Sequence, residues 1–475
     1  MSPPRADTVV IGQVVVAAAS DRLHTVEAIG IANGRVVSAG PRDEVLEGAR
    51  PGATRIDAGP RAVVPGLRDF HLHLVGMARA GREVVLDEAA DVGTLLSLLR
   101  AGAERLPAAA WLRGRGWRED ALTGAERATL DRAVGARPAL LYSHDGHSAW
   151  ASSEALRRAG LERSSTNPAG GRLERDADGE LSGVLRETAT DLVEAVAERL
   201  RGEELARAVN GTVADLAALG VTAVVDAGDS APDGGNGPYA ALGDRASALL
   251  SLRGWLEGRL RLTVNLPADA IADAAELGLR SGASVDGSQT MRMGWAKAFV
   301  DGALGSRTAA LFDPYTCGPA GQTGIPRLSP DELDALIAAG RRAGIGMAIH
   351  AIGDRGVADV LDAFEQASPR APETPPDRIE HLQLMRGADL PRLARFDITA
   401  SMQPVHCAAD RPMVDACWSD RVADAYPMAA LRAAGARLAF GSDAPIEPPN
   451  PWTGIFAAVH RRYPRDGTPD WQAQQ

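Results

Sequence analysis

Two histidines stand two residues apart in the segment DFHLHL, at His71 and His73. On a β-strand, residues i and i+2 share a face, so both imidazole rings point the same way. Neutral imidazoles at this spacing suit a divalent transition metal. Taken alone, the pair fits a solvated strand face equally well, and both interpretations stay open at this point.

Four further polar residues lie towards the carboxyl ends of apolar, strand-like runs. His350 ends the run GMAIH, and His381 ends RIEH. Asp443 ends LAFGSD, and Lys297 lies within WAKAFVDG. In a parallel barrel this end of the strands forms the active face. A lone histidine in an apolar strand is usually a packed core residue, but five of the nine histidines at such positions are hard to assign to packing: His71, His73, His350, His381 and His406.

Lys297 is the only lysine of the chain; the other 50 of the 51 Lys and Arg residues are arginine. A coding bias towards arginine explains the excess, but it does not explain why one position kept lysine. A surface cation tolerates either residue, whereas a site that needs a deprotonatable amine requires lysine. The count alone is a weak indication, and the neighbours of Lys297 decide how it is interpreted.

The elements that must position these residues are predicted from alternating apolar and helical runs. Short apolar runs separated by Ala-, Leu- and Arg-rich stretches are typical of βα units. Eight candidate strands predict a (β/α)8 TIM-type barrel, an α/β fold, and they lie at 62–74, 221–228, 260–267, 295–302, 346–354, 378–384, 398–404 and 437–445. Ser329 and Glu332 predict a capping box at the start of the helix 329–344.

The rest of the chain divides around this barrel. Residues 1–64 read as a small β module, in which Asn33-Gly34 is a strong hairpin signal. Residues 65–475 form the barrel, with a large insertion at 82–210 after its first strand. The composition of 228–241 predicts a flexible loop.

Composition excludes several classes of protein. The 475 residues are 45% hydrophobic and 24% charged, as in an ordinary globular protein, and the net charge of −11 argues against nucleic acid as a partner. No apolar run approaches the ~18 residues of a membrane span. Three cysteines, Cys317, Cys407 and Cys417, cannot form a disulfide framework and suggest a reducing compartment. We therefore expect a cytoplasmic protein that acts on a small-molecule substrate. A homo-oligomer is compatible with the sequence.

Several motifs together resemble the amidohydrolase superfamily, specifically the branch that includes N-substituted formamide deformylase. The resemblance covers nearly the whole chain in the family's order, and the motifs are specific only in combination. They are VVPGLRDFHLHL, RPALLYSHDGHSAW, GRLERDADGELSGVLRE, WAKAFVDGALGSRTAALFDPY, HAIGDRGV, RIEHLQL, SMQPVHCAAD and FGSDAPIEPPNPWTGIFAAV.

The resemblance implies a ligand set for one or two divalent ions, with zinc as the expected metal. His71 and His73 would bind the more buried ion. Lys297, carboxylated by CO2 on its amine, would bridge two ions, and His350 with His381 would hold the second. This agrees with the lysine count, because only a primary amine forms a carbamate.

Further roles follow from the same resemblance. Asp443 would be a metal ligand and the catalytic base that shuttles the proton. His147 would line the substrate pocket, although a turn-capping role is equally open, and His406 could hydrogen-bond a substrate oxygen. Asp301 and Arg307 would bind substrate or order the pocket, with a loop-holding role favoured for Arg307.

The implied reaction is hydrolysis of a C–N bond in a small non-peptide amide or formamide by metal-activated hydroxide. The alternatives are another reaction on the same metal site, such as lactone or ester hydrolysis, and a catalytically impaired barrel that only binds a ligand. The family's chain usually continues beyond the position that matches Gln475, with a last barrel helix and strands that complete a β-sandwich. We therefore expect the 1–64 module to be an incomplete sandwich with an open edge, and the protein to be poorly soluble or of low stability.

Overall fold

The computed structural model describes residues 4–464 and residue 471, with gaps at 20–21, 88, 108, 119–125, 199, 201, 229–259, 286 and 288–289. Almost all of the predicted loop at 228–241 therefore lies outside the described residues. The chain forms two compact units, Met1–Leu67 and Arg68–Gln475. Among the described helices, none has the length and apolarity needed to cross a membrane.

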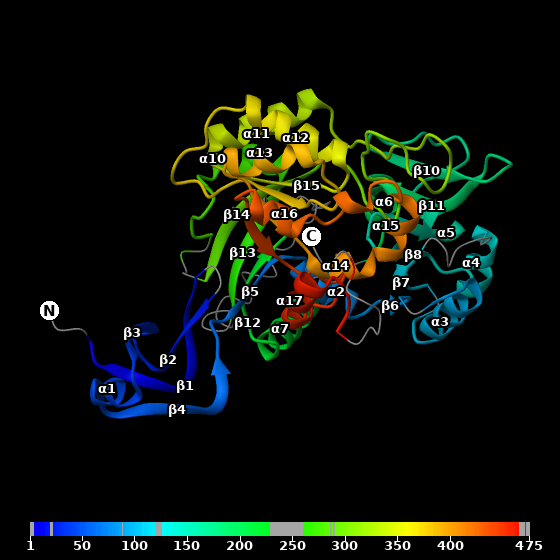
Figure 1. Cartoon of the computed structure of the whole chain (residues 1–475). Coiled ribbons are helices and arrows are strands. Elements are labelled where there is room, and N and C mark those ends of the chain that lie inside the picture. The colour runs from blue at the N-terminus through cyan, green and yellow to red at the C-terminus, as the bar shows by residue number, and fades with distance from the viewer. Residues whose placement is uncertain are drawn as a thin grey trace. The chain divides into compact units, whose positions relative to one another are not determined.

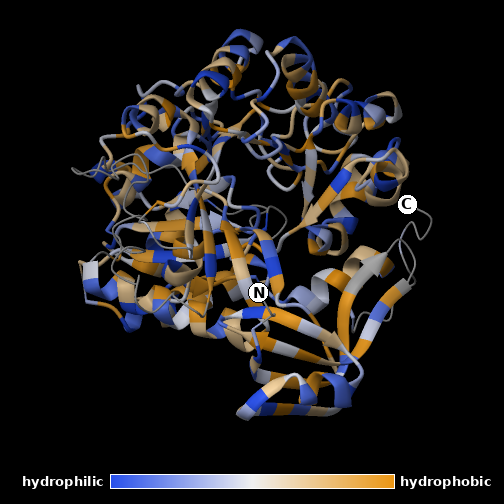
Figure 2. Cartoon of the chain, turned by 90° about the vertical axis from the view of Figure 1, so that its left-hand side faces the viewer, coloured by the Kyte–Doolittle hydropathy of each residue, from blue (hydrophilic) through white to orange (hydrophobic). Residues whose placement is uncertain are grey.

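The N-terminal unit contains a four-stranded mixed sheet in the order β3-β2-β1-β4. Its elements are β1 (Ala6–Ala19), β2 (Arg22–Ala32), β3 (Arg35–Gly40), α1 (Arg42–Glu47) and β4 (Ala49–Val63). β1 pairs antiparallel with β2 and parallel with β4. Asn33 and Gly34 both have positive φ and connect β2 to β3, which confirms the predicted hairpin. The strands carry both hydrophobic and hydrophilic residues (Figure 2), and β1 is a mostly apolar run that includes the buried residues Val9 and Ile11.

Eight parallel strands form the central sheet of the larger unit, in the order β18-β17-β16-β15-β14-β13-β12-β5 (Figure 1). The strands are β5 (Leu67–Leu72), β12 (Val221–Asp226), β13 (Arg261–Pro267), β14 (Met291–Phe299), β15 (Met347–Ala351), β16 (Arg378–His381), β17 (Thr399–Met402) and β18 (Arg437–Phe440). Each overlaps one of the eight runs predicted from the sequence. The predicted barrel is therefore confirmed.

Hydrogen bonds beyond the end of β18 bring the last strand back to the first. The backbone N–H of Asp443 donates to the carbonyl of His71 at 2.7 Å, and the N–H of His73 donates to the carbonyl of Ala444 at 2.8 Å. The sheet is thus nearly closed. This closure places His71 and His73 beside Asp443, although the histidines follow the first barrel strand and Asp443 follows the last.

The helices that follow the strands share one apolar core with them. Among the described residues, they are α2 (Leu74–Ala80), α7 (Gly202–Ala218), α10 (Ile271–Glu276), α11 (Pro330–Ala343), α12 (Asp354–Gln366), α13 (Leu390–Arg395), α14 (Pro404–Ala409), α15 (Arg411–Cys417) and α16 (Met428–Ala433). The helix after β18, α17 (Pro451–His460), buries Ala457 outside this core. Leu205 of α7, Ile337 of α11 and Leu361 of α12 are buried with the strand residues Val224 and Ile349. The predicted capping box starts α11: Ser329 accepts from the N–H of Glu332, which bonds back to Ser329.

A second mixed sheet is inserted between β5 and β12, in the order β10-β11-β9-β8-β7-β6. Its strands are β6 (Val84–Val85), β7 (Leu112–Trp117), β8 (Ala139–Ser143), β9 (Ser148–Ala151), β10 (Gly171–Arg175) and β11 (Leu181–Glu187). Its helices are α3 (Val92–Glu104), α4 (Arg127–Val134), α5 (Ser153–Arg158) and α6 (Ala189–Glu194). Two separate apolar clusters involve this sheet, one with Leu99 and Trp117 and the other with Leu156 and Leu185.

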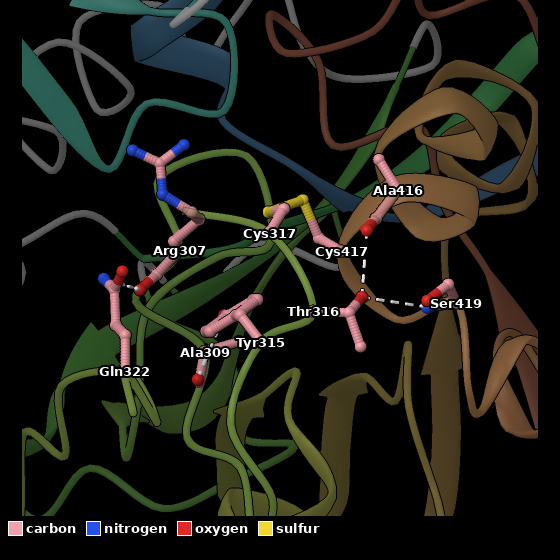
Figure 3. The surroundings of a disulfide bond; sticks show 9 residues. All are labelled: Arg307, Ala309, Tyr315, Thr316, Cys317, Gln322, Ala416, Cys417 and Ser419. Carbon is pink, nitrogen blue, oxygen red and sulfur yellow. Dashed lines mark hydrogen bonds between the residues drawn. A yellow bond between two sulfur atoms is a disulfide. The ribbon is translucent and has the colours of Figure 1, made fainter. Parts of the chain in front are cut away.

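The cysteines require a correction to the sequence analysis. Cys317 and Cys417 form a disulfide across 100 residues of sequence (Figure 3). Cys407 is free and buried. A count of three excludes a framework of several disulfides, but it does not exclude one pair. The inference of a reducing compartment from the cysteine count therefore loses its basis.

Candidate metal centre

The carboxyl ends of the barrel strands carry the residues predicted to bind metal. His71 lies near the end of β5, and His73 directly follows that strand, at the N-cap of α2. His381 is the last residue of β16, and Asp443 follows β18. All are buried except His73, whose side chain is 19% exposed. Their positions agree with the rule that parallel barrels place their chemistry at this face.

Two groups of three metal-binding side chains meet at Asp443. His71, His73 and Asp443 form one group, and His381, His406 and Asp443 form the other; the ligand atoms within each group lie within 4.8 Å of one another. Oδ1 of Asp443 lies 3.0 Å from Nε2 of His73 and 3.3 Å from Nε2 of His71. Oδ2 of Asp443 lies 3.2 Å from Nε2 of His406. Imidazole nitrogen and carboxylate oxygen are ligands that zinc accepts.

Two buried ring nitrogens at this centre are unsatisfied. Among the described residues, Nδ1 of His381 has no hydrogen-bond partner, and Nε2 of His71 makes no hydrogen bond although it faces Oδ1 of Asp443 at 3.3 Å. Nδ1 of His71 lies 2.5 Å from Oε2 of Glu380, so the carboxylate accepts the Nδ1 proton and leaves the lone pair on Nε2. A carboxylate that fixes the tautomer of a ligating histidine in this way is common at metal sites. The donor set therefore fits a divalent cation.

The electrostatics of the centre favour the charge states that bind cations. Burial alone would raise the pKa of Asp443, but His71 and the hydrogen bonds from His406 and His73 hold that pKa well below its usual value. Burial lowers the pKa of His381 well below the usual value for histidine; Asp443 opposes this effect, while His71 adds to it. Asp443 is therefore ionised and His381 neutral near pH 7, as metal ligands must be.

His350 lies beside this centre but, among the described residues, outside its two groups of His and Asp side chains, and Lys297 lies close enough to act electrostatically on His350 and His381. Nε2 of His350 donates to the carbonyl of Gly302 at 3.0 Å, and its ring centroid is 4.4 Å from that of His381. Lys297 is 3% exposed, and its Nζ lies 4.7 Å from the centre of the Phe299 ring. The positive charge of Lys297 helps to lower the pKa of both histidines.

His406, predicted to contact a substrate oxygen, lies in the second group instead of apart from the metal ligands. Burial would lower its pKa, but hydrogen bonds with Asp443 and Glu447 raise the pKa to about 10. Nδ1 of His406 is 3.8 Å from Oε1 of Glu447. Without a cation, His406 is therefore protonated near pH 7 and donates hydrogen bonds towards the carboxylates of Asp443 and Glu447. A protonated imidazole acts as a hydrogen-bond donor and not as a metal ligand.

Glu380 is a site residue that the sequence analysis missed. On a regular strand, neighbouring side chains point to opposite faces. If His381 faces the metal centre, the side chain of Glu380 is therefore expected to point away from the centre. However, His381 has a φ of 77°, in the left-handed region that non-glycine residues rarely adopt. Glu380 bonds to His71, and the His381 ring lies 5.0 Å from the His71 ring, so both neighbours reach the same histidine. The sequence signal was the acidic residue directly before a candidate ligand.

The insertion brings His147 to the barrel site. Its ring centroid lies 5.0 Å from that of His350, and its Nδ1 is 3.0 Å from Oε2 of Glu187. Glu187 also accepts from Thr308 and forms an ion pair with Arg327 at 3.3 Å. Burial would lower the pKa of His147, but the charge of Glu187 raises it. His147 thus lines the small space at the metal centre. Glu187 was missed because it lies 40 residues further along the chain.

Asp301 is placed behind the site. Its carboxylate accepts the N–H groups of Ile352 at 3.0 Å, Gly353 at 2.8 Å and Ala310 at 2.9 Å. Burial raises its pKa to about 7, against the opposing effect of these bonds. Asp301 also lies 3.6 Å from Nε2 of His350. These contacts order the loops around His350 and leave Asp301 away from the lining of the small space at the metal centre.

Arg307 holds the loop that follows β14 and lines a second, larger space. Its φ is 53°, and its carbonyl accepts from Nε2 of Gln322 at 2.9 Å. A Cβ added at Gly318 would lie 3.1 Å from Cδ and Nε of Arg307, so the arginine packs against this glycine. This arrangement agrees with the loop-holding role predicted for Arg307.

Two adjoining spaces open at this face of the barrel. The first, which we call the metal recess, is small and is lined by residues that include His147, His381, His406 and Asp443. The second, which we call the large cavity, has a volume of about 880 Å³. Both are bordered by four shared residues: His144, Asp145, Gly305 and Asp410. A small polar site beside a larger space is the usual arrangement of a small-molecule site.

The fold and these side chains define a (β/α)8 protein with a candidate His/His/Asp metal site at the carboxyl ends of its strands. The model of the Amidohydrolase family matches residues 54–474, and the chain belongs to this family. The resemblance found in the sequence is thereby confirmed.

Individual relatives agree with this assignment. YtcJ of Bacillus subtilis is 31% identical over 455 residues, which cover 92% of this chain and 80% of YtcJ. N-substituted formamide deformylase of Arthrobacter pascens is 26% identical over 455 residues, with the same two shares covered. An uncharacterized metal-dependent hydrolase from Pyrococcus horikoshii has a structure with a TM-score of 0.73 and 25% identity, covering 96% of this chain and 86% of that one.

Proposed function

We propose that this protein is a metal-dependent hydrolase that cleaves the C–N bond of a small non-peptide amide or formamide. The observation that carries the proposal is the convergence of His71, His73, His381 and His406 on Asp443, with two buried ring nitrogens unsatisfied among the described residues. Membership in the amidohydrolase family supports the hydrolytic reaction. The likeness to N-substituted formamide deformylase supports the class of bond.

Zinc is the metal that we propose, because the set of imidazoles and a carboxylate suits it. His71, His73 and Asp443 would hold one ion, and His381 with Asp443 would contribute to a second. When bound there, the ion supplies Lewis acidity, which lowers the pKa of water and polarises a carbonyl.

The chain's own groups do the rest of the work. Glu380 keeps His71 in the tautomer whose Nε2 faces Asp443. Asp443 is the base: its carboxylate accepts a proton from the attacking water and delivers it to the leaving nitrogen. The products are a carboxylic acid, formic acid for a formamide, and an amine. His147, held by Glu187, faces the recess where the carbonyl oxygen would lie.

For Lys297 we propose carboxylation by CO2: the ammonium first loses one proton, and the neutral amine then attacks CO2 and releases a second proton as the carbamate forms. The support is a single primary amine, 3% exposed, within the electrostatic reach of His350 and His381. A carbamate would replace a buried cation beside these rings by an anionic oxygen ligand, to which His350 would add its imidazole. Arginine cannot form this group, so Lys297→Arg keeps the charge and loses the chemistry.

The test starts from protein stripped with a chelator and reloaded with zinc or manganese in bicarbonate. Metal content is measured by mass spectrometry, and a panel of formamides, N-acyl amines and hydantoins is assayed by product analysis. We expect at least one equivalent of metal and turnover of one amide class, with Lys297→Arg inactive. Less than about half an equivalent after reloading, or full activity of Lys297→Arg, would contradict the proposal.

A further inference from the structure

A disulfide bond forms part of the wall of the large cavity beside the metal recess. Cys317 and Cys417 both line it and are joined by a disulfide. Cys317 lies in the loop after β14, the strand that carries Lys297, and Cys417 ends α15, which follows the helix of His406. The disulfide therefore ties together two segments that each begin at the candidate metal centre.

The two segments are also joined by a backbone hydrogen bond from the N–H of Thr316 to the carbonyl of Cys417 at 3.0 Å and by exposed side-chain hydrogen bonds (Figure 3). Tyr315 of the loop and Val414 of α15 are buried in the same apolar core. Oγ1 of Thr316 donates to the carbonyl of Ala416 at 2.9 Å and accepts the N–H of Ser419 at 3.2 Å. Arg421 donates to the carbonyl of Pro314 at 2.9 Å. Water replaces exposed hydrogen bonds at little net cost. Without the disulfide, the apolar core would still hold α15 on the barrel, but the rim of the cavity between Cys317 and Cys417 would be held only by hydrogen bonds.

The remaining walls of the cavity are largely apolar. Trp117, Trp150 and Val184 come from the inserted sheet, and Met413 comes from α15. Some polar groups of the lining bond to one another: Ser306 donates to Asp145 at 2.6 Å, and Ser143 donates to the same carboxylate at 2.5 Å. Charged and titratable side chains also line the cavity, namely Arg118, His144, Arg307 and Asp410. A volume of about 880 Å³ with such walls suits a large apolar substituent on the substrate.

We propose that the Cys317–Cys417 disulfide is a redox-reversible wall that sets how large an amide the site accepts. The proposal rests on the proposed function, because it assigns the large cavity to the substituent of the amide that is cleaved. In the oxidised protein the wall is fixed and the cavity is preformed for a bulky group. In the reduced protein the rim between Cys317 and Cys417 is no longer fixed, so the bulky group loses part of a preformed surface and binds more weakly.

The geometry indicates which sulfur a reductant would reach. Cys317 is half-buried between the exposed residues Thr316 and Gly318, whereas Cys417 is 2% exposed. The thiolate of a small dithiol would attack Sγ of Cys317, form a mixed disulfide and release Cys417 as a thiol. The second thiol of the reductant then closes its own disulfide and releases Cys317, so two electrons and two protons are transferred to the protein.

The experiment compares oxidised protein, protein reduced with dithiothreitol, and the Cys317→Ser/Cys417→Ser variant. Cys407→Ser is the matched control, since Cys407 is buried and its pKa is raised to about 12 by that burial, which leaves it an unreactive thiol. Mass spectrometry after alkylation counts the free thiols. Calorimetry measures the Kd of N-(2-naphthylmethyl)formamide for metal-free protein, and hydrogen exchange follows the segment 411–417.

We expect the Kd of the bulky formamide to rise about fivefold or more in the reduced and double-serine forms, a change of roughly 1 kcal/mol. Exchange in 411–417 should become faster, and Cys407→Ser should change neither quantity. In metal-loaded protein, kcat/KM for the bulky formamide should fall while that for N-methylformamide stays within about twofold. If the double variant does not fold, the reduced wild-type protein supplies the same comparison.

Unchanged Kd and exchange in protein that carries two additional free thiols would overturn the proposal. An equal loss for both formamides would also overturn it, because it would assign the disulfide a general structural role. Absence of hydrolysis in oxidised, metal-loaded protein that still binds the bulky formamide would instead count against the proposed function. The two failures are therefore distinguishable.

Discussion

The metal centre and the polar cluster around Asp145 bury similar side chains but satisfy them differently. At the metal centre, Nε2 of His71 and Nδ1 of His381 make no hydrogen bond among the described residues. In the cluster, both oxygens of Asp145 accept hydrogen bonds, from Ser143 and Ser306. A buried polar atom without a partner costs about 1–3 kcal/mol. The comparison teaches that the first cluster is built to be completed by a ligand, whereas the second is complete and acts as scaffold.

The largest effect is expected at the residue that both metal-binding groups share. Asp443→Asn keeps the shape of the side chain but removes the anion and the base. We expect kcat/KM to fall by about 10³ or more, the upper range for loss of a general base. Steady-state assays of the metal-loaded variant measure this. Asp362→Asn, at a carboxylate that is 61% exposed, is the control and should retain wild-type activity.

The next effect concerns the carboxylate that holds His71. In Glu380→Gln the neutral amide no longer fixes the Nδ1 proton, so we expect metal affinity to weaken about 10- to 100-fold. Competition with a chromogenic chelator measures the affinity, and Glu365→Gln, 41% exposed, is the control. Thermal unfolding of the metal-free variant separates loss of affinity from loss of fold, because Glu380 also pairs with Arg378 at 2.9 Å. An affinity equal to wild type would refute this role of Glu380.

A smaller effect is expected where the insertion meets the barrel. Glu187→Gln removes the anion that holds His147, while the metal ligands keep their places. We expect kcat/KM to fall about tenfold, which corresponds to one charge-assisted hydrogen bond of roughly 1.5 kcal/mol. Metal content should equal that of the wild type. A loss of metal in this variant would show that the insertion is part of the metal centre. The metal centre and the polar side chains of the insertion could then no longer be treated as separate clusters.

The fold was predictable from the sequence because short, mainly apolar runs alternate with helical stretches, and several of the runs have polar residues at their carboxyl ends. The ends of these runs also predicted His71, His381 and Asp443 as neighbours, since parallel strands bring their carboxyl ends to one face. The contribution of Glu380 was not predictable, because the positive φ of His381 breaks the alternation on which the face assignment depends.

Pairs of residues far apart in the chain could not be predicted from the sequence, for a different reason. Nothing in the spacing of Cys317 and Cys417 indicates that they meet, since 100 residues and several elements separate them. The same holds for His147 and Glu187, which only the pairing of the inserted strands brings together. Local patterns determine elements and their faces, whereas these contacts depend on how the elements pack.

The smallest effect is a pH dependence of stability at the border of the insertion. His144 pairs with Asp87 at 2.8 Å and lies 3.4 Å from Glu447. Burial would lower its pKa, but these two carboxylates raise the pKa to about 9. Because the folded pKa lies above the unfolded value of about 6.5, the stabilisation is fully present below pH ~6.5 and is lost as pH rises through about 9.

Chemical denaturation between pH 6 and 10 checks this sign. The wild-type free energy of unfolding should decline by about 1 kcal/mol more than that of His144→Asn over this range, after allowance for partial solvent exposure of Asp87. Parallel curves for the two proteins would contradict the assignment of this ion pair as a stabilising contact.

The most direct measurement of the central claim is an anomalous difference map at the zinc absorption edge, from crystals of the zinc-loaded protein. We predict a peak within bonding distance of the Asp443 carboxylate and of Nε2 of His71 and His73. No peak at Asp443 after loading, or zinc bound only at sites away from the carboxyl ends of the strands, would contradict the metal centre and with it the proposed hydrolase.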